Sequence, residues 1–442
     1  MEILIKAAQL LLSLSILVIV HEFGHFITAK LFKTRVEKFY LFFDPWFSLF
    51  KYKKGETEYG IGWLPLGGYV KISGMMDESM DKEQMQMPAQ PWEFRSKKTW
   101  QRLIIMLGGV TLNVLLAFGI YICMLWAWGD SYLPTKEAKY GIVVDSIGQQ
   151  MGLQNGDKIL KLDGKIVEDF AKIPNHIILD RVKIITIERN NQTVDLIIPV
   201  GIVGKIIKQK SASLLAPRIP FIVESVVKNS GALKAGIQKN DHIISLDTIK
   251  TPFYDQFTAH IKSYSGKIVK IGILRGKDTV YCNTKVSNEG TIGTIIDINI
   301  SKYFTISKRD YSLFQAIPAG FTKTISGIDN YFKQLRLLFS KDVKAYESVG
   351  GFISIGNIFP SAWDWQSFWT LTAFLSIMLA ILNVLPIPAL DGGHVMFLLF
   401  EMITGRKPSD KFLEYAQIVG MVLLLALLLF ANGNDVIRLF KH

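Results

Sequence analysis

The sequence predicts a polytopic α-helical membrane protein that also contains two copies of a small β-rich fold. Hydrophobic residues make up 49% of the 442 residues, and the long apolar runs lie at the two ends of the chain. The middle of the chain has an ordinary soluble composition and contains an internal repeat. With the usual prior of about 100 to 200 residues per domain, a chain of this length holds two or three domains. We therefore expect several structural units.

Four apolar segments are long enough to cross a bilayer, which requires roughly 20 helical residues. They are residues 1–33, 99–129, 366–402 and 411–432, and the third contains a Pro-rich break. A signal peptide explains the first segment poorly, because the segment lacks a basic start and a small-residue cleavage site where these would be needed. The segments are therefore predicted to be four transmembrane helices.

The loops between these segments predict the orientation of the chain. Lys and Arg are frequent in residues 34–98 and recur in the short connection after the third segment, so both loops are expected to be cytoplasmic. Residues 130–365 then lie across the membrane. The net charge of +12 fits an anionic membrane surface, and because no nucleic-acid motif accompanies it, no nucleic-acid partner is expected.

The internal repeat lies between the second and third apolar segments. Gly152-Leu153-Gln154-Asn155-Gly156-Asp157 recurs as Gly236-Ile237-Gln238-Lys239-Asn240-Asp241, and strand-like alternation follows each copy. We expect β-rich domains at residues 130–208 and 209–300. Residues 301–365 should include an amphipathic helix that lies on the membrane or packs against the domain pair.

The first apolar segment is interrupted by His21-Glu22-Phe23-Gly24-His25. On a helix, this spacing places two imidazoles on one face, where both can bind one zinc ion, with a carboxylate beside them to act as a base. Two His and a Glu are costly in lipid and persist mostly where they pair or do chemistry. The alternative is a polar cluster that only holds helices together.

A catalytic zinc ion usually has three protein ligands, and the third apolar segment offers the missing one. Asp391 is the one acidic residue between Asp364 and Glu401, and His394 is the competing candidate three positions on. The Pro and Gly residues around Asp391 should break the helix and free backbone to line a cavity. On these grounds alone, either Asp391 or His394 could be the third ligand.

Together these motifs resemble the site-2 protease family of intramembrane zinc metalloproteases. The resemblance rests on His21 to His25, on Asn383-Val384-Leu385-Pro386-Ile387-Pro388-Ala389-Leu390-Asp391-Gly392-Gly393, and on Phe94-Arg95-Ser96-Lys97, Gln101-Arg102, Gly108-Gly109 and Asn113 in and before the second segment. The repeat resembles bacterial PDZ domains, which bind extended peptides. With two such copies, the chain is most similar to the regulator of sigma E protease group of bacterial inner membranes.

The resemblance implies roles for individual residues. His21, His25 and Asp391 would bind Zn²⁺, and Glu22 would be the catalytic base. Asn383 would hold the substrate backbone, although a helix-capping or helix-packing role explains it too. The family also has a membrane-re-entrant β-hairpin, expected here at about residues 58–72. Substrate would contact its Gly60, Gly62, Gly67, Gly68 and Tyr69, and a plain cytoplasmic hairpin is the alternative.

The expected activity is therefore hydrolysis of peptide bonds within transmembrane segments of single-pass proteins. The resemblance implies anti-sigma factors or remnant signal peptides as substrates, and periplasmic PDZ-like domains that take peptide ligands or limit access. Asn240 and Thr248, which replace expected glycines in the second copy, make peptide binding there less secure. A non-catalytic PDZ-bearing receptor or scaffold and a zinc transporter are the rival interpretations. The intact His-Glu-His motif argues against the first, and the scarcity of further intramembrane ionisable residues argues against the second.

Overall fold

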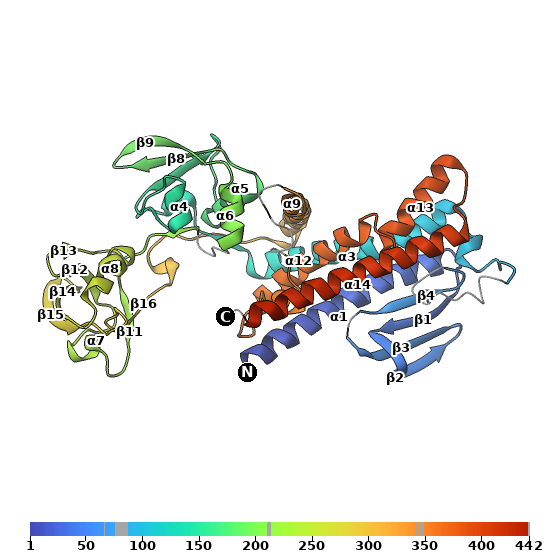
Figure 1. Ribbon diagram of the computed structural model, residues 1–442, viewed down its shortest axis with the longest axis horizontal. Helices are drawn as coiled ribbons and strands as arrows, with labels where there is room; N and C mark the ends of the chain where they lie inside the picture. The colour runs from blue at the N-terminus through green and yellow to red at the C-terminus, as the bar shows by residue number, and fades with distance from the viewer. Residues whose placement is uncertain (66, 76–86, 210–213, 341–342, 344–348, 441–442) are drawn as a thin grey trace. The chain divides into compact units, whose positions relative to one another are not determined.

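The computed structural model describes residues 1–65, 67–75, 87–209, 214–340, 343 and 349–440. The chain forms two compact units. The first comprises residues 1–129, 310–336 and 349–442, and the second comprises residues 130–309 and 337–348. The elements of both units are labelled in Figure 1.

Four helices in the described part of the chain are long and apolar enough to cross a membrane. They are α1 (Glu2–Leu31), α3 (Thr99–Trp128), α12 (Trp365–Val384) and α14 (Asp410–Phe440). The four predicted spans are thus confirmed in number. The third is shorter than predicted, because Pro386 ends α12 and a separate helix, α13 (Asp391–Thr404), follows the break.

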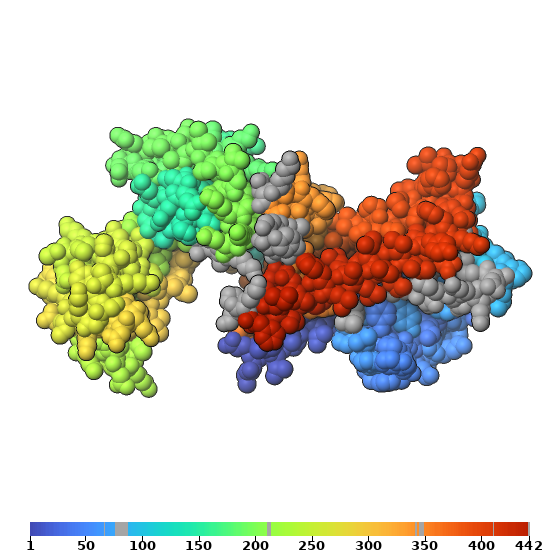
Figure 2. Space-filling model, viewed as in Figure 1, coloured from blue at the N-terminus to red at the C-terminus, as the bar shows by residue number. Residues whose placement is uncertain are grey.

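Helix α3 is the central helix of the first unit and packs against α1, α12 and α13. Figure 1 shows α1 and α14 with roughly parallel long axes. Much of the side-chain surface of α14 is apolar and uncovered, with Leu423 58% and Leu429 71% exposed. Figure 2 shows this helix as an uncovered ridge. Such a surface suits lipid rather than water.

Residues 301–365, where an amphipathic helix is expected, contain helix α9 (Leu313–Leu338). Ala316 and Tyr331 are buried, whereas Phe314, Phe321 and Phe332 are exposed. The short helix α11 (Phe352–Gly356) is held at its start by α14, because the Asp435 carboxylate accepts hydrogen bonds from the backbone N–H of Gly351 and of Ser354.

A four-stranded sheet follows α1 along the chain. Its strands are β1 (Val36–Leu41), β2 (Phe43–Lys54), β3 (Thr57–Leu64) and β4 (Tyr69–Ile72), and their order is β2-β3-β1-β4. β1 pairs with β3 in parallel and with β4 antiparallel, while β2 and β3 form a hairpin that turns at Gly55.

This order corrects the predicted hairpin of residues 58–72. Within the described residues, β3 and β4 are not neighbours, because β1 lies between them. β1 takes that place because Val36 and Tyr40 are buried, and Val36 joins a core that includes Ala29 of α1 and Ile105 of α3. Contact with α1 therefore anchors the sheet through β1 and leaves β4 as an edge strand.

The second unit contains the two sequence repeats as two small β-rich folds. The first copy and the strand leading into it contain β5 (Asp130–Tyr132), β6 (Ile142–Val144), α4 (Ser146–Gln150), β7 (Lys158–Leu162), α5 (Ile173–Leu179), β8 (Ile184–Arg189), β9 (Gln192–Ile197), α6 (Ile202–Gln209) and β10 (Leu215–Pro217). The second copy and its exit contain β11 (Val223–Val226), α7 (Gly231–Lys234), β12 (His242–Leu246), β13 (Ile249–Lys250), α8 (Tyr254–Ile261), β14 (Ile268–Arg275), β15 (Asp278–Lys285), β16 (Thr294–Ile296) and β17 (Ser307–Arg309). The larger sheets are β7-β8-β9 and β13-β12-β14-β15, and pairs form between β6 and β10, β11 and β16, and β5 and β17. Each copy has its own apolar core.

Each copy contains an equivalent ion pair between an arginine and a buried aspartate. Arg189 Nη2 lies 2.7 Å from Asp157 Oδ2 in the first copy, and Arg275 Nη2 lies 2.7 Å from Asp241 Oδ2 in the second. Each Arg also donates to a glycine carbonyl, that of Gly152 or its equivalent in the second copy. Since both pairs join the repeat motif to the same strand of its copy, the repeat in sequence is also a repeat in structure.

Asn240, which departs from the repeat pattern, adopts the backbone conformation of the glycine it replaces. Its φ is 68°, and the φ of Gly156 in the first copy is 98°. Asn enters the left-handed region more readily than other non-glycine residues. The departure therefore leaves this turn intact.

Candidate metal centre

His21 and His25 lie one turn apart on α1 and face the same side of the helix. Both are buried, at 8% and 6% exposure, and their Nε2 atoms are 3.3 Å apart. The i and i+4 spacing produces this arrangement, because such residues are neighbours on a helix surface.

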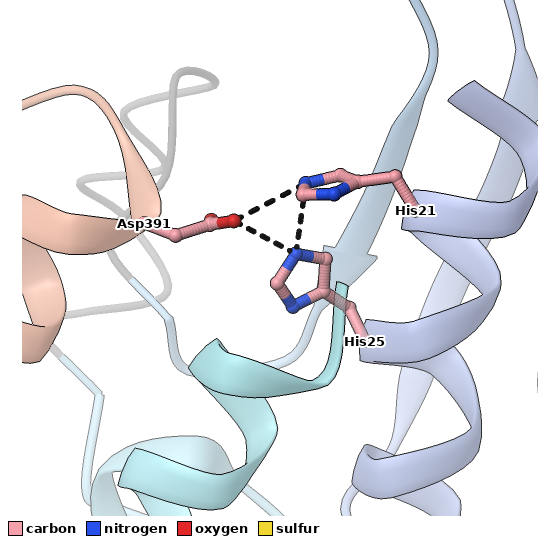
Figure 3. A group of neighbouring side chains, drawn as sticks. All are labelled: His21, His25 and Asp391. Atoms are coloured by element: carbon pink, nitrogen blue, oxygen red, sulfur yellow. Dashed lines mark hydrogen bonds and ion pairs between the residues drawn. The ribbon is translucent and has the colours of Figure 1, made fainter. Parts of the chain in front are cut away.

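Asp391 reaches the two imidazoles from the start of α13. Its Oδ2 lies 3.1 Å from His21 Nε2 and 3.2 Å from His25 Nε2, and Figure 3 shows the carboxylate pointing between the two rings. Despite these short distances, this buried oxygen has no hydrogen-bond partner of good geometry among the described residues. The three candidate ligand atoms lie within 4.8 Å of one another.

The chain can place Asp391 there because α13 begins in a tight fold. A Cβ on Gly392 would lie 2.2 Å from the carbonyl oxygen of Leu385, and a Cβ on Gly393 would lie 2.7 Å from that of Ile387. Two consecutive glycines therefore let the loop close against the helix start. Ala389 adopts φ 77° in this loop, a conformation that costs energy for a residue with a Cβ.

Helix α14 holds the same loop from the other side. Gln417 Oε1 accepts the backbone N–H of Ala389 at 3.2 Å, and a Cβ on Gly420 would lie 1.8 Å from the Pro388 carbonyl oxygen. The fourth span therefore supports the strained segment directly before Asp391.

The three side chains fit a zinc ion. In a tetrahedral site with bonds of about 2.0 to 2.1 Å, neighbouring ligand atoms lie about 3.3 Å apart. The three separations here are 3.1, 3.2 and 3.3 Å. Imidazole nitrogen and carboxylate oxygen are also common zinc donors. His394, the competing candidate ligand, is not part of this group among the described residues.

His25 is oriented for metal binding by α3. Its Nδ1 lies 2.9 Å from the carbonyl oxygen of Ile105, a group that can only accept, so Nδ1 carries the proton. Nε2 then keeps its lone pair. This is the usual support of a metal-binding histidine, whose second nitrogen donates to a carbonyl or carboxylate.

Gly109 of α3 makes room for both rings. A Cβ at this position would lie 2.5 Å from His25 Nε2 and 2.7 Å from His21 Cε1. Any larger residue would therefore occupy the space of the imidazoles. The sequence motif included Gly109, but nothing in its pattern indicated this steric role.

A cavity of about 650 Å³ opens beside the three side chains. Its walls include the following residues: His21, Glu22, His25, Lys38, Phe43, Gly68, Tyr69, Val70, Met106, Asp391 and His394. Glu22 thus shares the cavity with the candidate ligands, and β4 forms part of the wall. The cavity is large enough to hold a short stretch of extended peptide.

The remaining residues predicted to contact substrate are placed differently. Gly68 and Tyr69 line the cavity, but Gly60, Gly62 and Gly67 are not among the residues of its wall. A Cβ on Gly60 would lie 2.3 Å from the Tyr40 ring, and one on Gly62 would lie 2.1 Å from the Phe43 carbonyl oxygen. The small size of Gly60 and Gly62 therefore has a packing explanation within the sheet.

Asn383, in the last turn of α12, lies close to the candidate metal ligands. Its Nδ2 is 3.3 Å from His21 Nε2. Asn113 of α3 approaches the same ring from the other side, with Nδ2 3.2 Å from Nδ1. Sequence reasoning assigned no role to Asn113 or to Gln417.

The comparison with known proteins agrees with this geometry. The family model for peptidase family M50 matches residues 9–427. The chain belongs to this family. Peptidase family M50 is the site-2 protease family of intramembrane zinc metalloproteases, and the predicted family, enzyme class and cofactor are thereby confirmed.

Individual relatives resemble the chain over almost its full length. A regulator of sigma E protease of Salmonella typhimurium is 29% identical, over 99% of this chain and 100% of its own. The regulator of sigma E protease of Haemophilus influenzae is 26% identical over the same shares. A Campylobacter jejuni protein, described as a candidate zinc metalloprotease, is 29% identical over 97% of this chain and 92% of its own.

Proposed function

We propose that this metalloprotease cuts peptide bonds within transmembrane segments of single-pass membrane proteins. The observation that supports this most strongly is the position of the candidate zinc ligands. His21 and His25 lie in a helix that is apolar enough to span a membrane, and Asp391 joins them beside a cavity that also contains Glu22. Ionisable side chains at such a depth are retained chiefly for function.

In this proposal, His21, His25 and Asp391 hold the zinc ion, and Glu22 is the catalytic base. Zinc in such a site supplies Lewis acidity, which makes water easier to deprotonate near neutral pH. Glu22 receives the proton and later delivers it to the leaving amine. Asn383 is close enough to His21 to donate its amide N–H to a substrate carbonyl at the same site.

The substrate must present an unwound segment, because a helix hides its peptide bonds in its own hydrogen bonds. β4 is an edge strand, and Tyr69 and Val70 line the cavity beside Glu22. An extended substrate can replace its lost helical hydrogen bonds by pairing with such an edge. We propose that the sheet of β1 to β4 re-enters the membrane and presents β4 to the substrate.

The second unit is proposed to be a pair of PDZ-like domains. Its shared Asp-Arg pairs and its two separate cores support two copies of one fold. The positive-inside pattern of the loops supports a cytoplasmic position for residues 34–98 and a periplasmic position for this unit. We propose that the pair limits which proteins reach the site, and that substrates are anti-sigma factors or remnant signal peptides in a bacterial inner membrane.

Cleavage of a tagged single-pass protein with a short periplasmic segment tests the proposal. The full chain and its Glu22→Gln variant are placed in the same membranes, with and without a zinc chelator. Glu2→Gln is the matched control, because Glu2 lies on the same helix but at its exposed first turn. We expect the unmodified chain and the control to cut only when zinc is present, and Glu22→Gln to bind zinc without cutting.

Three other results would contradict the proposal. Cleavage by Glu22→Gln at the rate of the unmodified chain would assign the activity to another protease. Cleavage that persists both after chelation and in the Glu22→Gln variant would exclude a metal-dependent role for Glu22. If no sample cuts any of several such substrates while peptides still bind the second unit, a receptor or scaffold becomes the better interpretation.

A further inference from the structure

One face of α3 lies against the two histidines of α1. Ile105, Gly109 and Asn113 are spaced four residues apart and therefore lie along one side of the helix. Ile105 accepts from His25 Nδ1, and Gly109 leaves room for both rings. Asn113 completes the row opposite His21, at 3.2 Å from its Nδ1.

Asn113 lies in the interior of the first unit. The residue is completely buried. Its backbone carbonyl oxygen accepts a hydrogen bond from the Ser376 hydroxyl of α12 at 2.7 Å. The side chain therefore cannot turn to solvent. Its Oδ1 atom is buried without a hydrogen-bond partner among the described residues.

The two orientations of this amide have opposite consequences for His21. With Nδ2 towards the ring, the amide donates to Nδ1, so the proton must reside on Nε2, and Oδ1 stays unpartnered. After rotation by 180°, Oδ1 accepts a proton from Nδ1, and Nε2 keeps the lone pair that a metal requires. The second orientation leaves the amide nitrogen without its His21 partner, but it alone produces a His21 whose Nε2 can bind metal.

We propose that Asn113 is a positioning residue that fixes the tautomer of His21 by accepting the Nδ1–H with its side-chain oxygen. The side-chain oxygen of Asn113 then does for His21 what the carbonyl of Ile105 does for His25. Both ligating histidines receive their support from the same face of α3. This inference rests on the proposed zinc ligands, and it adds a residue that touches neither zinc nor substrate.

Zinc affinity of the purified full chain tests the inference, measured by competition with a chelator. Asn113→Leu removes the acceptor at similar volume and should weaken zinc binding by about 10- to 100-fold, the usual effect of losing such support. Asn113→Asp keeps an oxygen acceptor and should bind at least as tightly as the unmodified chain. The visible spectrum of the cobalt-substituted protein should change for Asn113→Leu and stay similar for Asn113→Asp.

Ser376→Ala separates this effect from packing. It removes the hydrogen bond to the backbone of Asn113 but leaves the amide in place, so zinc affinity should change little. Unchanged zinc affinity and cobalt spectrum in Asn113→Leu would overturn the inference, as would equal losses in the Leu and Asp variants. Failure of the unmodified chain to bind zinc would instead overturn the proposed metal centre, and the inference with it.

Discussion

Gly24 of α1 and Gly108 of α3 touch through their backbones. A Cβ on Gly24 would lie 2.3 Å from the Gly108 carbonyl oxygen, and a Cβ on Gly108 would lie 2.5 Å from the Gly24 carbonyl oxygen. Small residues allow membrane helices to approach closely. Because Gly24 lies between the two histidines, this contact brings the His-Glu-His turn of α1 directly against α3.

Gly108→Ala should separate the two helices. The added methyl group meets backbone on α1, which cannot move aside as a side chain can, so we expect a loss of about 1 to 3 kcal/mol of stability. Gly119→Ala on the same helix is the control, because no described atom lies within 4 Å of its Cβ position. Thermal unfolding of the purified chain measures both. Equal melting temperatures for the two variants would contradict the close contact.

Gly109→Ala should act on the metal centre rather than on helix contact alone. Its methyl group would enter the space of both imidazole rings, so we expect zinc affinity to fall by more than tenfold. Competition with a chelator measures the affinity, and Gly119→Ala again serves as the control. A variant that binds zinc as tightly as the unmodified chain would show that the rings can move aside without cost.

The sequence predicted much of the candidate site but little of its support. His21, His25 and Asp391 were recognisable because zinc chemistry restricts residue type and spacing, and the structure brings all three together. The roles of Gly109 and Gln417 depend on contacts between distant segments, which no local pattern encodes. Such contacts can be recognised only when the packing of the helices is known.

The fold was likewise predictable in part. Length and hydropathy indicated four spans, since bilayer thickness fixes the length of a crossing helix. The sheet was not fully predictable, because pairing was assumed between the strands nearest in sequence. β1 inserts between β3 and β4, in part through parallel pairing, and its charged residues Glu37 and Lys38 obscured the strand pattern.

Asp391 and His394 should differ sharply in their effect on zinc. Asp391→Ala removes one of the three candidate ligand atoms, and we expect stoichiometric zinc binding to be lost. His394 lines the cavity but is not one of these three residues, so His394→Ala should retain the zinc content. Metal analysis of the purified variants measures both. Loss of zinc in His394→Ala with retention in Asp391→Ala would exchange their assigned roles.

The edge strand should be the place where substrate lies. A photo-crosslinking amino acid at Val70 of β4 faces the cavity region and should capture a single-pass substrate in the Glu22→Gln background. Tyr52 of β2 lies at the opposite edge of the same sheet and is 58% exposed, so the same group there is a matched control. Equal capture at both positions would contradict a specific role for β4.

An ion pair at the far end of α13 should help to place Asp391. Arg102 Nη2 of α3 lies 2.5 Å from Glu401 Oε1, and both side chains are largely buried. Glu401→Leu leaves the Arg102 charge buried without its partner, which typically costs about 3 to 5 kcal/mol. We expect α13 to shift away from α3, so that zinc affinity falls together with the melting temperature.

Replacing both partners tests whether the pair positions the helix or only satisfies a charge. The double variant Arg102→Met with Glu401→Leu removes both charges at similar volume, and such replacements are often neutral for stability. Melting temperature should therefore recover relative to Glu401→Leu. If zinc affinity recovers as well, apolar packing between α3 and α13 is enough to hold Asp391 against the histidines. If stability returns while zinc affinity stays low, the directional hydrogen bond from Arg102 sets the position of α13 along α3, and the ion pair is part of the support of the metal centre.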